Sequence, residues 1–131
     1  MSAQDNVDLV LAYLAARGRG DVDAALDLVA DDVSQRLMFA MPGSPGVWHG
    51  KEGLRGFVDN LKRLFPDGTT VTVERIHGSG DSVAVETTNS GTTFKGTEYG
   101  NRYCYIYEIV DGKISEIREY ADSHYARDVL G

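Results

Sequence analysis

Apolar residues recur at helical spacing through most of the first half of the chain. Two apolar stripes, Val7–Leu14 and Val22–Val29, predict a pair of helices joined by a short turn in which Asp21 can cap the second helix. A third helix is expected from about Lys51 to Phe65, where apolar residues again fall on one side. Between the second and third helices, Gln35–Met41 has the character of a strand.

The period of the pattern changes from 3.6 to 2 at Thr69, where apolar and polar residues begin to alternate. Asp111-Gly112 is a strong hairpin signal between a long strand, Glu98–Val110, and a last strand, Lys113–Ala121. The tail Ser123–Leu130 can form one or two helical turns. Helices followed by an antiparallel meander predict an α+β fold.

Composition narrows the class of protein. A chain of 131 residues is expected to form one domain, residues 1–131, because each half of it would be too short to form a sufficient hydrophobic core of its own. The formal charge of −7 argues against a nucleic-acid partner, which needs a basic face. The sequence shows neither an export signal nor an apolar run long enough for a membrane-spanning helix. With Cys104 as the single cysteine, a reducing, cytoplasmic location is expected.

Motifs for nucleotide binding and for a serine nucleophile are missing from the sequence. His49, His77 and His124 are widely separated, and Cys104 lies in the middle of a predicted strand. We therefore expect no metal and no organic cofactor. Acid–base chemistry by carboxylates and phenols remains open.

Several short segments, in their order along the chain, resemble the nuclear transport factor 2-like superfamily and, within it, the SnoaL-like and ketosteroid-isomerase-like branch. These segments are Gly20-Asp21, Trp48–Gly53, Asp111–Ile114 and Arg118–Asp122. The resemblance implies a cystatin-like fold, in which three helices wrap a curved antiparallel sheet into a cone around a ligand cavity. It also implies a frequent homodimer. The superfamily includes isomerases, polyketide cyclases, dehydratases (lyases), epoxide hydrolases and plain binding domains, so the fold does not decide the function.

The catalytic positions of these relatives are only partly filled here. Tyr13 falls where ketosteroid isomerases carry a phenol that binds the oxyanion, but the positions of their two acids, near Leu37 and near Tyr103–Tyr105, hold no acid. The Arg-x-Asp pair of limonene-epoxide-hydrolase-like members would fall at Thr87–Asn89. Only their late aspartate, which SnoaL-like cyclases also use, is matched, by Asp122. Steroid isomerisation by the known machinery is therefore not expected.

Asp122 is the central candidate for proton transfer. Alternation places Tyr120 and Arg118 on its face of the strand, with Ala121 and Glu119 facing away. If that face is the cone interior, loss of hydration raises the pKa of the Asp122 carboxyl toward a useful range. The alternative is that Asp122 caps the terminal helix.

The remaining candidates would bind or orient an oxygenated substrate. Three of them, Tyr13, Asn101 and Tyr103, are expected to hold the oxygen on which charge develops. The expected substrate-binding residues are Trp48, His49, Thr87, Asn89, Tyr120, Phe39 and Phe57. Each has an alternative interpretation, such as core packing, a polar ladder between strands, or an exposed loop side chain.

Three functions remain open at this stage. The first is a cofactor-independent enzyme that applies general acid–base catalysis to a hydrophobic, oxygenated small molecule by cyclisation, isomerisation, dehydration or epoxide opening. The second is a non-catalytic protein that binds a hydrophobic small molecule, and the third is a dimerising module with a collapsed cavity. The alternation of Tyr103, Tyr105 and Tyr107 with Cys104 and Ile106 leaves both strand faces partly apolar, which favours a homodimer through the sheet.

Overall fold

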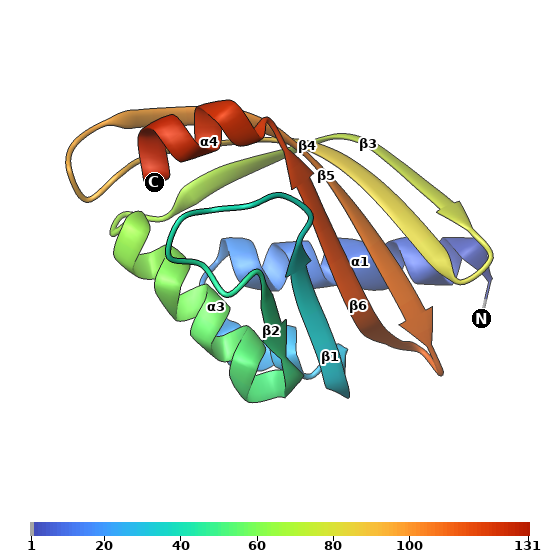
Figure 1. Cartoon of the computed structure of the whole chain (residues 1–131). Coiled ribbons are helices and arrows are strands. Elements are labelled where there is room, and N and C mark those ends of the chain that lie inside the picture. Colours follow the sequence, from blue (N-terminus) through green and yellow to red (C-terminus); the bar gives the residue numbers. More distant parts are fainter. Residues whose placement is uncertain (1) are drawn as a thin grey trace.

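A computed structural model of the protein describes residues 2–131. Figure 1 shows a single six-stranded sheet with its helices. The helices are α1 (Ala3–Gly18), α2 (Val22–Leu26), α3 (Gly50–Leu64) and α4 (Ser123–Leu130). The strands are β1 (Val29–Leu37), β2 (Val47–His49), β3 (Thr69–Ser79), β4 (Ser82–Thr92), β5 (Glu98–Val110) and β6 (Lys113–Ala121).

Side-chain caps set the starts of α1 and α2. Ser2 and Asp5 form a reciprocal capping box at the start of α1. Asp21 accepts a hydrogen bond from the Ala24 N–H at the start of α2, as the sequence predicts. Gly20 has a φ of +75°, a left-handed conformation that lets the chain turn sharply between the two helices.

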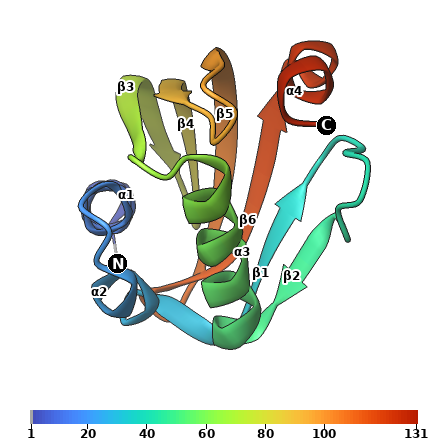
Figure 2. The same ribbon diagram turned by 90° about the vertical axis from the view of Figure 1, so that its left-hand side faces the viewer.

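The sheet has the order β2-β1-β6-β5-β4-β3, and all neighbouring strands are antiparallel except β1 and β6. It curves strongly, and α1 and α3 lie on its concave side (Figure 2). The predicted α+β class, with helices packed inside a curved sheet, is confirmed.

The early strands differ from the sequence prediction in two ways. The strand expected at Gln35–Met41 begins instead at Val29, which the helical pattern had assigned to the second helix. Exposed acids at Asp31 and Asp32 conceal the alternation of this strand, although Val33 is completely buried. The short strand β2 was not predicted, because its three residues acquire strand character only by pairing with Ser34–Arg36.

The core fills the space between the concave face of the sheet and the helices. Tyr13 of α1 is fully buried and packs edge-on against Tyr107 of β5, with ring centroids 6.0 Å apart. Trp48 of β2 packs against Phe57 of α3 in the same way, at 4.8 Å. These contacts fix α1 and α3 relative to the sheet and so shape the space left between them.

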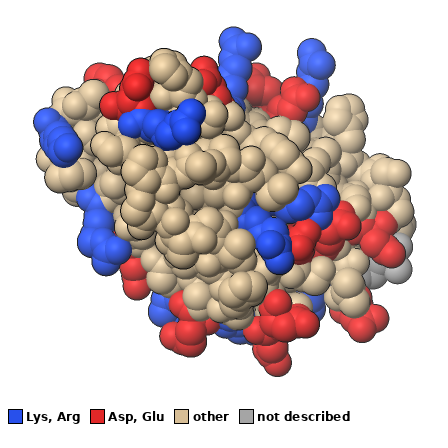
Figure 3. Space-filling model, viewed as in Figure 1, with Lys and Arg blue, Asp and Glu red and all other residues tan. Residues whose placement is uncertain are grey.

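On the face shown in Figure 3, a broad area of uncharged residues lies beside interspersed acidic and basic side chains. None of the helices in residues 2–131 has the length and apolar character needed to cross a membrane.

Candidate functional site

A cavity of about 450 Å³ lies between the concave face of the sheet and the facing sides of α1 and α3. Its walls are mainly apolar and aromatic, with a few polar groups, which is typical of small-molecule sites. The apolar and aromatic lining residues include Leu14, Val58, Leu61, Phe65, Tyr99, Tyr103 and Tyr105. The polar and charged ones include Arg17, Arg19, Lys62, Asn89 and Glu119.

Glu119 is the only acidic residue among the described residues that line this cavity. It lies on β6 opposite Tyr105 of β5, and its side chain is only 8% exposed. Burial raises the pKa of the Glu119 carboxyl to about 7, although the Arg17 charge acts in the opposite direction. The Nε2 of Gln35, a fully buried residue of β1, donates a hydrogen bond to Oε1 of Glu119 at 3.3 Å. The cavity therefore contains a positioned carboxyl group that can take up or release a proton near neutral pH.

Three tyrosines of β5, Tyr99, Tyr103 and Tyr105, line the same cavity as this carboxyl group. The Tyr99 and Tyr103 hydroxyls are 2.6 Å apart, and Nδ2 of Asn89 donates to the Tyr105 hydroxyl at 2.9 Å. The rings of Tyr103 and Tyr105 are stacked, with centroids 5.7 Å apart. Burial, with the nearby Glu119 charge, raises the pKa of both phenols, so they remain protonated and can act as hydrogen-bond donors.

Arg17 contributes a cationic group from the last turn of α1. Its guanidinium lies over the rings of Tyr13 and Phe57, 5.8 and 5.5 Å from their centroids. The charge of Glu119 is one of the influences that raise the pKa of Arg17. The site thus combines one carboxyl group, several phenol donors and one guanidinium within an apolar wall.

The structure places Asp122 at the start of α4, which is the alternative interpretation given above, and not in the cone interior. Its side chain is exposed and caps α4, accepting a hydrogen bond from the Tyr125 N–H at 3.2 Å. Strand β6 ends at Ala121, so the alternation cannot be extended to residue 122. The predicted alternation holds for residues 118–120, but the inner face is the one that carries Glu119, because Glu119 lines the cavity and Tyr120 is 41% exposed on the outer face.

Other polar candidates lie on the concave face of the sheet. Tyr103 and Asn89 line the cavity. Thr87 is buried and its hydroxyl donates to Oδ1 of Asn89 at 2.7 Å, so it supports the wall. Asn101 is also buried, and its Nδ2 donates to the Tyr99 hydroxyl at 2.9 Å and to the Asp122 carbonyl at 3.1 Å. This arrangement matches the alternative interpretation of Asn101 as part of a polar ladder.

The structure does not bring the remaining candidates to the cavity wall. Tyr13 lies in the core behind it, and its hydroxyl has no hydrogen-bond partner among the described residues. Trp48 and Phe57 pack against each other in the core. His49 is exposed just before α3 and makes no side-chain cap, and Phe39 is half-buried in the β1–β2 connection.

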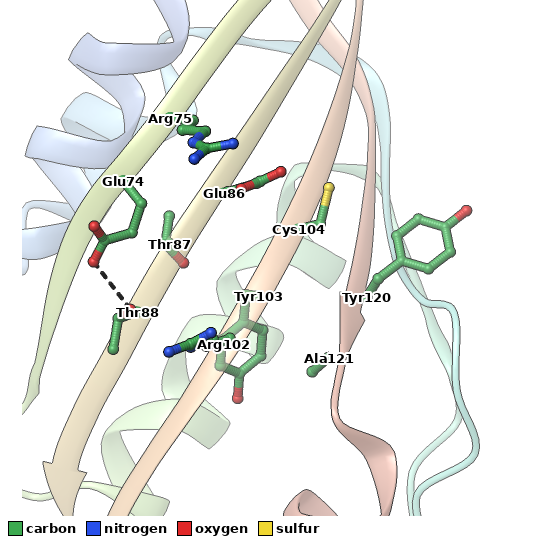
Figure 4. Close-up of a pocket in the computed structure, with 10 residues that line it drawn as sticks. All are labelled: Glu74, Arg75, Glu86, Thr87, Thr88, Arg102, Tyr103, Cys104, Tyr120 and Ala121. Atoms are coloured by element: carbon green, nitrogen blue, oxygen red, sulfur yellow. Dashed lines mark hydrogen bonds between the residues drawn. The ribbon is translucent and has the colours of Figure 1, made fainter.

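A second hollow, of about 780 Å³, lies on the outer face of the sheet (Figure 4). It is wide and open, and acidic and basic side chains of β3, β4 and β5 alternate across it. Among them are Glu74, which accepts a hydrogen bond from the Thr88 hydroxyl at 3.1 Å, and Arg75, Glu86 and Arg102. Although it is larger, this hollow lacks the enclosed walls and the buried carboxyl group of the inner cavity. We therefore assign the candidate site to the inner cavity.

Sequence reasoning did not identify Glu119, Arg17, Gln35 or Tyr105 as site residues. A signal for Glu119 was present, because alternation counted forwards from the apolar Ile117 places residue 119 on the core face. A register shift opposite Glu108 and Ile109 puts Ile114 and Ile117 three residues apart on the buried face, which breaks the simple alternation of β6. The others required knowledge of which side chains meet across the cavity.

Comparison with models of protein families identifies the family of this chain. Residues 10–117 match the model of the SnoaL-like domain, so the protein belongs to the SnoaL-like family of the nuclear transport factor 2-like superfamily. Comparison with curated protein sequences finds no significant match. The resemblance inferred from the sequence is confirmed at the level of the family.

Solved structures share the fold over almost the whole chain. An NTF2-like protein from Burkholderia xenovorans LB400 has a TM-score of 0.85 at 21% identity, covering 100% of this chain and 99% of that one. TerC, co-crystallised with polyporic acid, has a TM-score of 0.86 at 21% identity, covering 95% and 97%. An LEH-like epoxide hydrolase from M. tuberculosis has a TM-score of 0.75 at 21% identity, covering 97% and 90%. At these identities the likeness establishes the fold, which is also that of a cystatin-like protein from Xanthomonas campestris.

Proposed function

We propose that this protein is a cofactor-independent enzyme that uses general acid–base catalysis on a hydrophobic, oxygenated small molecule. The observation that carries the proposal is the burial of Glu119 in the cavity wall, which raises the pKa of its carboxyl group to about 7. A group with this pKa can both donate and accept a proton at neutral pH, which is what a general acid–base catalyst must do. Glu119 takes the role that the sequence had suggested for Asp122.

The other cavity groups support this chemistry. Tyr103 and Tyr105 are protonated donors beside the carboxyl group and can stabilise negative charge that develops on a substrate oxygen. Gln35 is a positioning residue, because its amide holds one Glu119 oxygen through a hydrogen bond. Reactions of this kind include aldol cyclisation, isomerisation, dehydration and epoxide opening. Polyketide-, terpenoid- and steroid-like compounds are suitable in size and polarity for the cavity.

Turnover of a panel of aryl ketones, quinones and epoxides, followed by mass spectrometry and NMR, tests the proposal. For any compound that is converted, Glu119→Gln is expected to lower kcat/KM by about a hundredfold or more, because the amide cannot carry the proton. Asp122→Asn is the matched control, since it changes one acid to its amide outside the cavity and should leave turnover unchanged. Equal activity of Glu119→Gln and wild type would exclude the assigned role.

A non-catalytic binding protein is the second candidate. It is favoured by the presence of only one acid among the described cavity-lining residues, whereas ketosteroid isomerases and limonene-epoxide-hydrolase-like enzymes each use two. If the panel compounds bind but none is converted, and Glu119→Gln binds them as tightly as the wild type, the binding function is the correct one.

A homodimer that associates through the outer face of the sheet, and a cytoplasmic location, are compatible with both candidates and remain predictions.

A further inference from the structure

The charges at the inner cavity differ in sign from the charge of the whole chain. The protein has a formal charge of −7, yet three basic residues, Arg17, Arg19 and Lys62, line the cavity against one acid, Glu119. Because the pKa of Glu119 is about 7, its carboxyl group is neutral in a large share of molecules at neutral pH. The cavity therefore carries net positive charge within an acidic protein.

Arg17 differs from the other cations in how it is held. Arg19 pairs with Asp21 at 3.9 Å, and Lys62 is exposed. The ion pairs formed among residues 2–131 do not include Arg17. Instead its partly buried guanidinium is held over the aromatic rings of Tyr13 and Phe57. The ring faces hold the group in place, and among the described residues only the Tyr13 hydroxyl lies where it can draw on one of its five N–H donors, so the other donors are free for a ligand.

A partly buried cation without a carboxylate partner is costly, and an anion that enters the cavity offsets this cost. The rest of the wall limits what that anion can be. Leu14, Val58, Leu61 and Phe65 require an apolar body, and the phenols of Tyr103 and Tyr105 allow aromatic stacking or hydrogen bonds to oxygen. A strongly hydrated ion with more than one charge would lose too much hydration among these side chains.

We propose that the inner cavity selects an aromatic or polycyclic monoanion whose carboxylate or other delocalised oxyanion is bound by the Arg17 guanidinium. The proposal deepens the proposed function and rests on it for the location of the ligand, since both use the same cavity. Arg17 would fix the anionic end of the molecule, and the neutral part would lie along the tyrosines toward Glu119. The substrate class is then narrower than hydrophobic and oxygenated compounds in general.

A pair of probes that differ mainly in charge tests this selection. Isothermal titration calorimetry would compare 2-naphthoate with the neutral 2-naphthamide, both added to the wild-type protein at neutral pH. The wild type is expected to bind 2-naphthoate at least about tenfold more tightly, because charge-assisted hydrogen bonds to a guanidinium are stronger than neutral ones. Equal affinity for the two probes, or no binding of 2-naphthoate, would overturn the proposal without any variant.

Variants then assign the selection to one residue. Arg17→Gln is expected to weaken 2-naphthoate binding about tenfold to a hundredfold and to change 2-naphthamide binding less than about threefold. Arg55→Gln is the matched control, since it removes the same charge from α3, where Arg55 pairs with Asp23 at 2.8 Å outside the cavity lining. Equal losses in the two variants would mean that only the overall charge matters, and the proposal would fail. Arg17→Lys, which keeps the charge, provides a second variant if Arg17→Gln does not fold, and it should retain part of the preference.

Glu119→Gln separates this proposal from the proposed function. It should abolish turnover if Glu119 moves the proton, yet it should bind 2-naphthoate at least as tightly as the wild type, because no negative charge remains beside the ligand. If the protein still prefers 2-naphthoate but converts no compound, the anion site at Arg17 is supported and the proposed catalytic function is rejected. If the protein converts panel compounds but binds 2-naphthoate and 2-naphthamide equally, the anion site at Arg17 is rejected and the proposed catalytic function is retained.

Discussion

The two acids near the end of β6 have opposite environments although they are only three residues apart. Glu119 is buried in the cavity wall, while Asp122 is exposed and accepts a hydrogen bond from the backbone of α4. Burial disfavours a charged carboxylate, whereas capping interactions favour it. The chemical difference between the two residues therefore comes from their surroundings, and it can be measured as an effect on stability.

Protein stability is expected to fall as the pH rises toward and through 7, because of Glu119. The pKa of its carboxyl group rises from the ordinary 4.5 to about 7 on folding, so between these values the folded state holds a proton that the unfolded state has lost. The folded state binds more protons, and the free energy of unfolding therefore decreases with rising pH and levels off above about 7. The full loss amounts to roughly 3 kcal/mol for a shift of this size.

Urea unfolding between pH 4.5 and 8.5 measures this effect when wild type and Glu119→Gln are compared. The variant has no proton to lose at this position, so its stability relative to the wild type should rise by a few kcal/mol across the range. Glu52→Gln, which removes an exposed acid on α3, serves as the control and should show no such trend. Parallel pH profiles for wild type and Glu119→Gln would contradict the raised pKa.

At the level of elements, the start of α4 explains why Asp122 resembled a catalytic residue. The sequence places an acid directly after the last strand, and such an acid can either point into a cone or cap a following helix. The structure shows that the cap is formed, with the Asp122 carboxylate bound to the Tyr125 N–H. An eight-residue helix has few other sources of stability, so this contact matters for its integrity.

Asp122→Ala is expected to lower the free energy of unfolding by about 1 kcal/mol, the usual cost of removing an N-cap side chain. Asp122→Asn should cost much less, because the asparagine oxygen can accept the same hydrogen bond. Urea denaturation, together with amide hydrogen exchange at Tyr125, measures both variants. Binding of ligands in the inner cavity should be the same in the two variants, and a large loss of affinity in Asp122→Ala alone would show that α4 contributes to the site.

The elements were more predictable from the sequence than the site. The helix start at Asp21 and the hairpin at Asp111-Gly112 depend on local chemistry that a short segment contains. Glu119 and Arg17 belong to elements that are distant in the sequence, and their presence in the lining of one cavity depends on sheet curvature and on a register shift in β6. A pattern of alternation gives two faces, but it does not tell which face is inside once a bulge interrupts it.

At the scale of the whole molecule, the sheet has one covered face and one open face. The helices α1 and α3 pack on the concave side, and the outer side of β4, β5 and β6 carries half-buried Cys104 and Ile106 and the 41%-exposed Tyr120. The acidic and basic groups around the outer hollow can form complementary pairs across a symmetric interface, because the same patch meets itself in reverse orientation.

We therefore expect a homodimer through this outer face, measured by light scattering after size-exclusion chromatography at micromolar concentration. Cys104→Arg should convert the dimer to a monomer, because it places a bulky charge at the centre of the face. Val110→Arg introduces the same charge at the exposed end of the same strand, where Val110 is 57% exposed, and should leave the dimer intact. Since the cavity lies on the opposite side of the sheet, the monomeric variant should still bind its ligand. A monomeric wild type, or equal behaviour of the two variants, would mean that the outer face has another role.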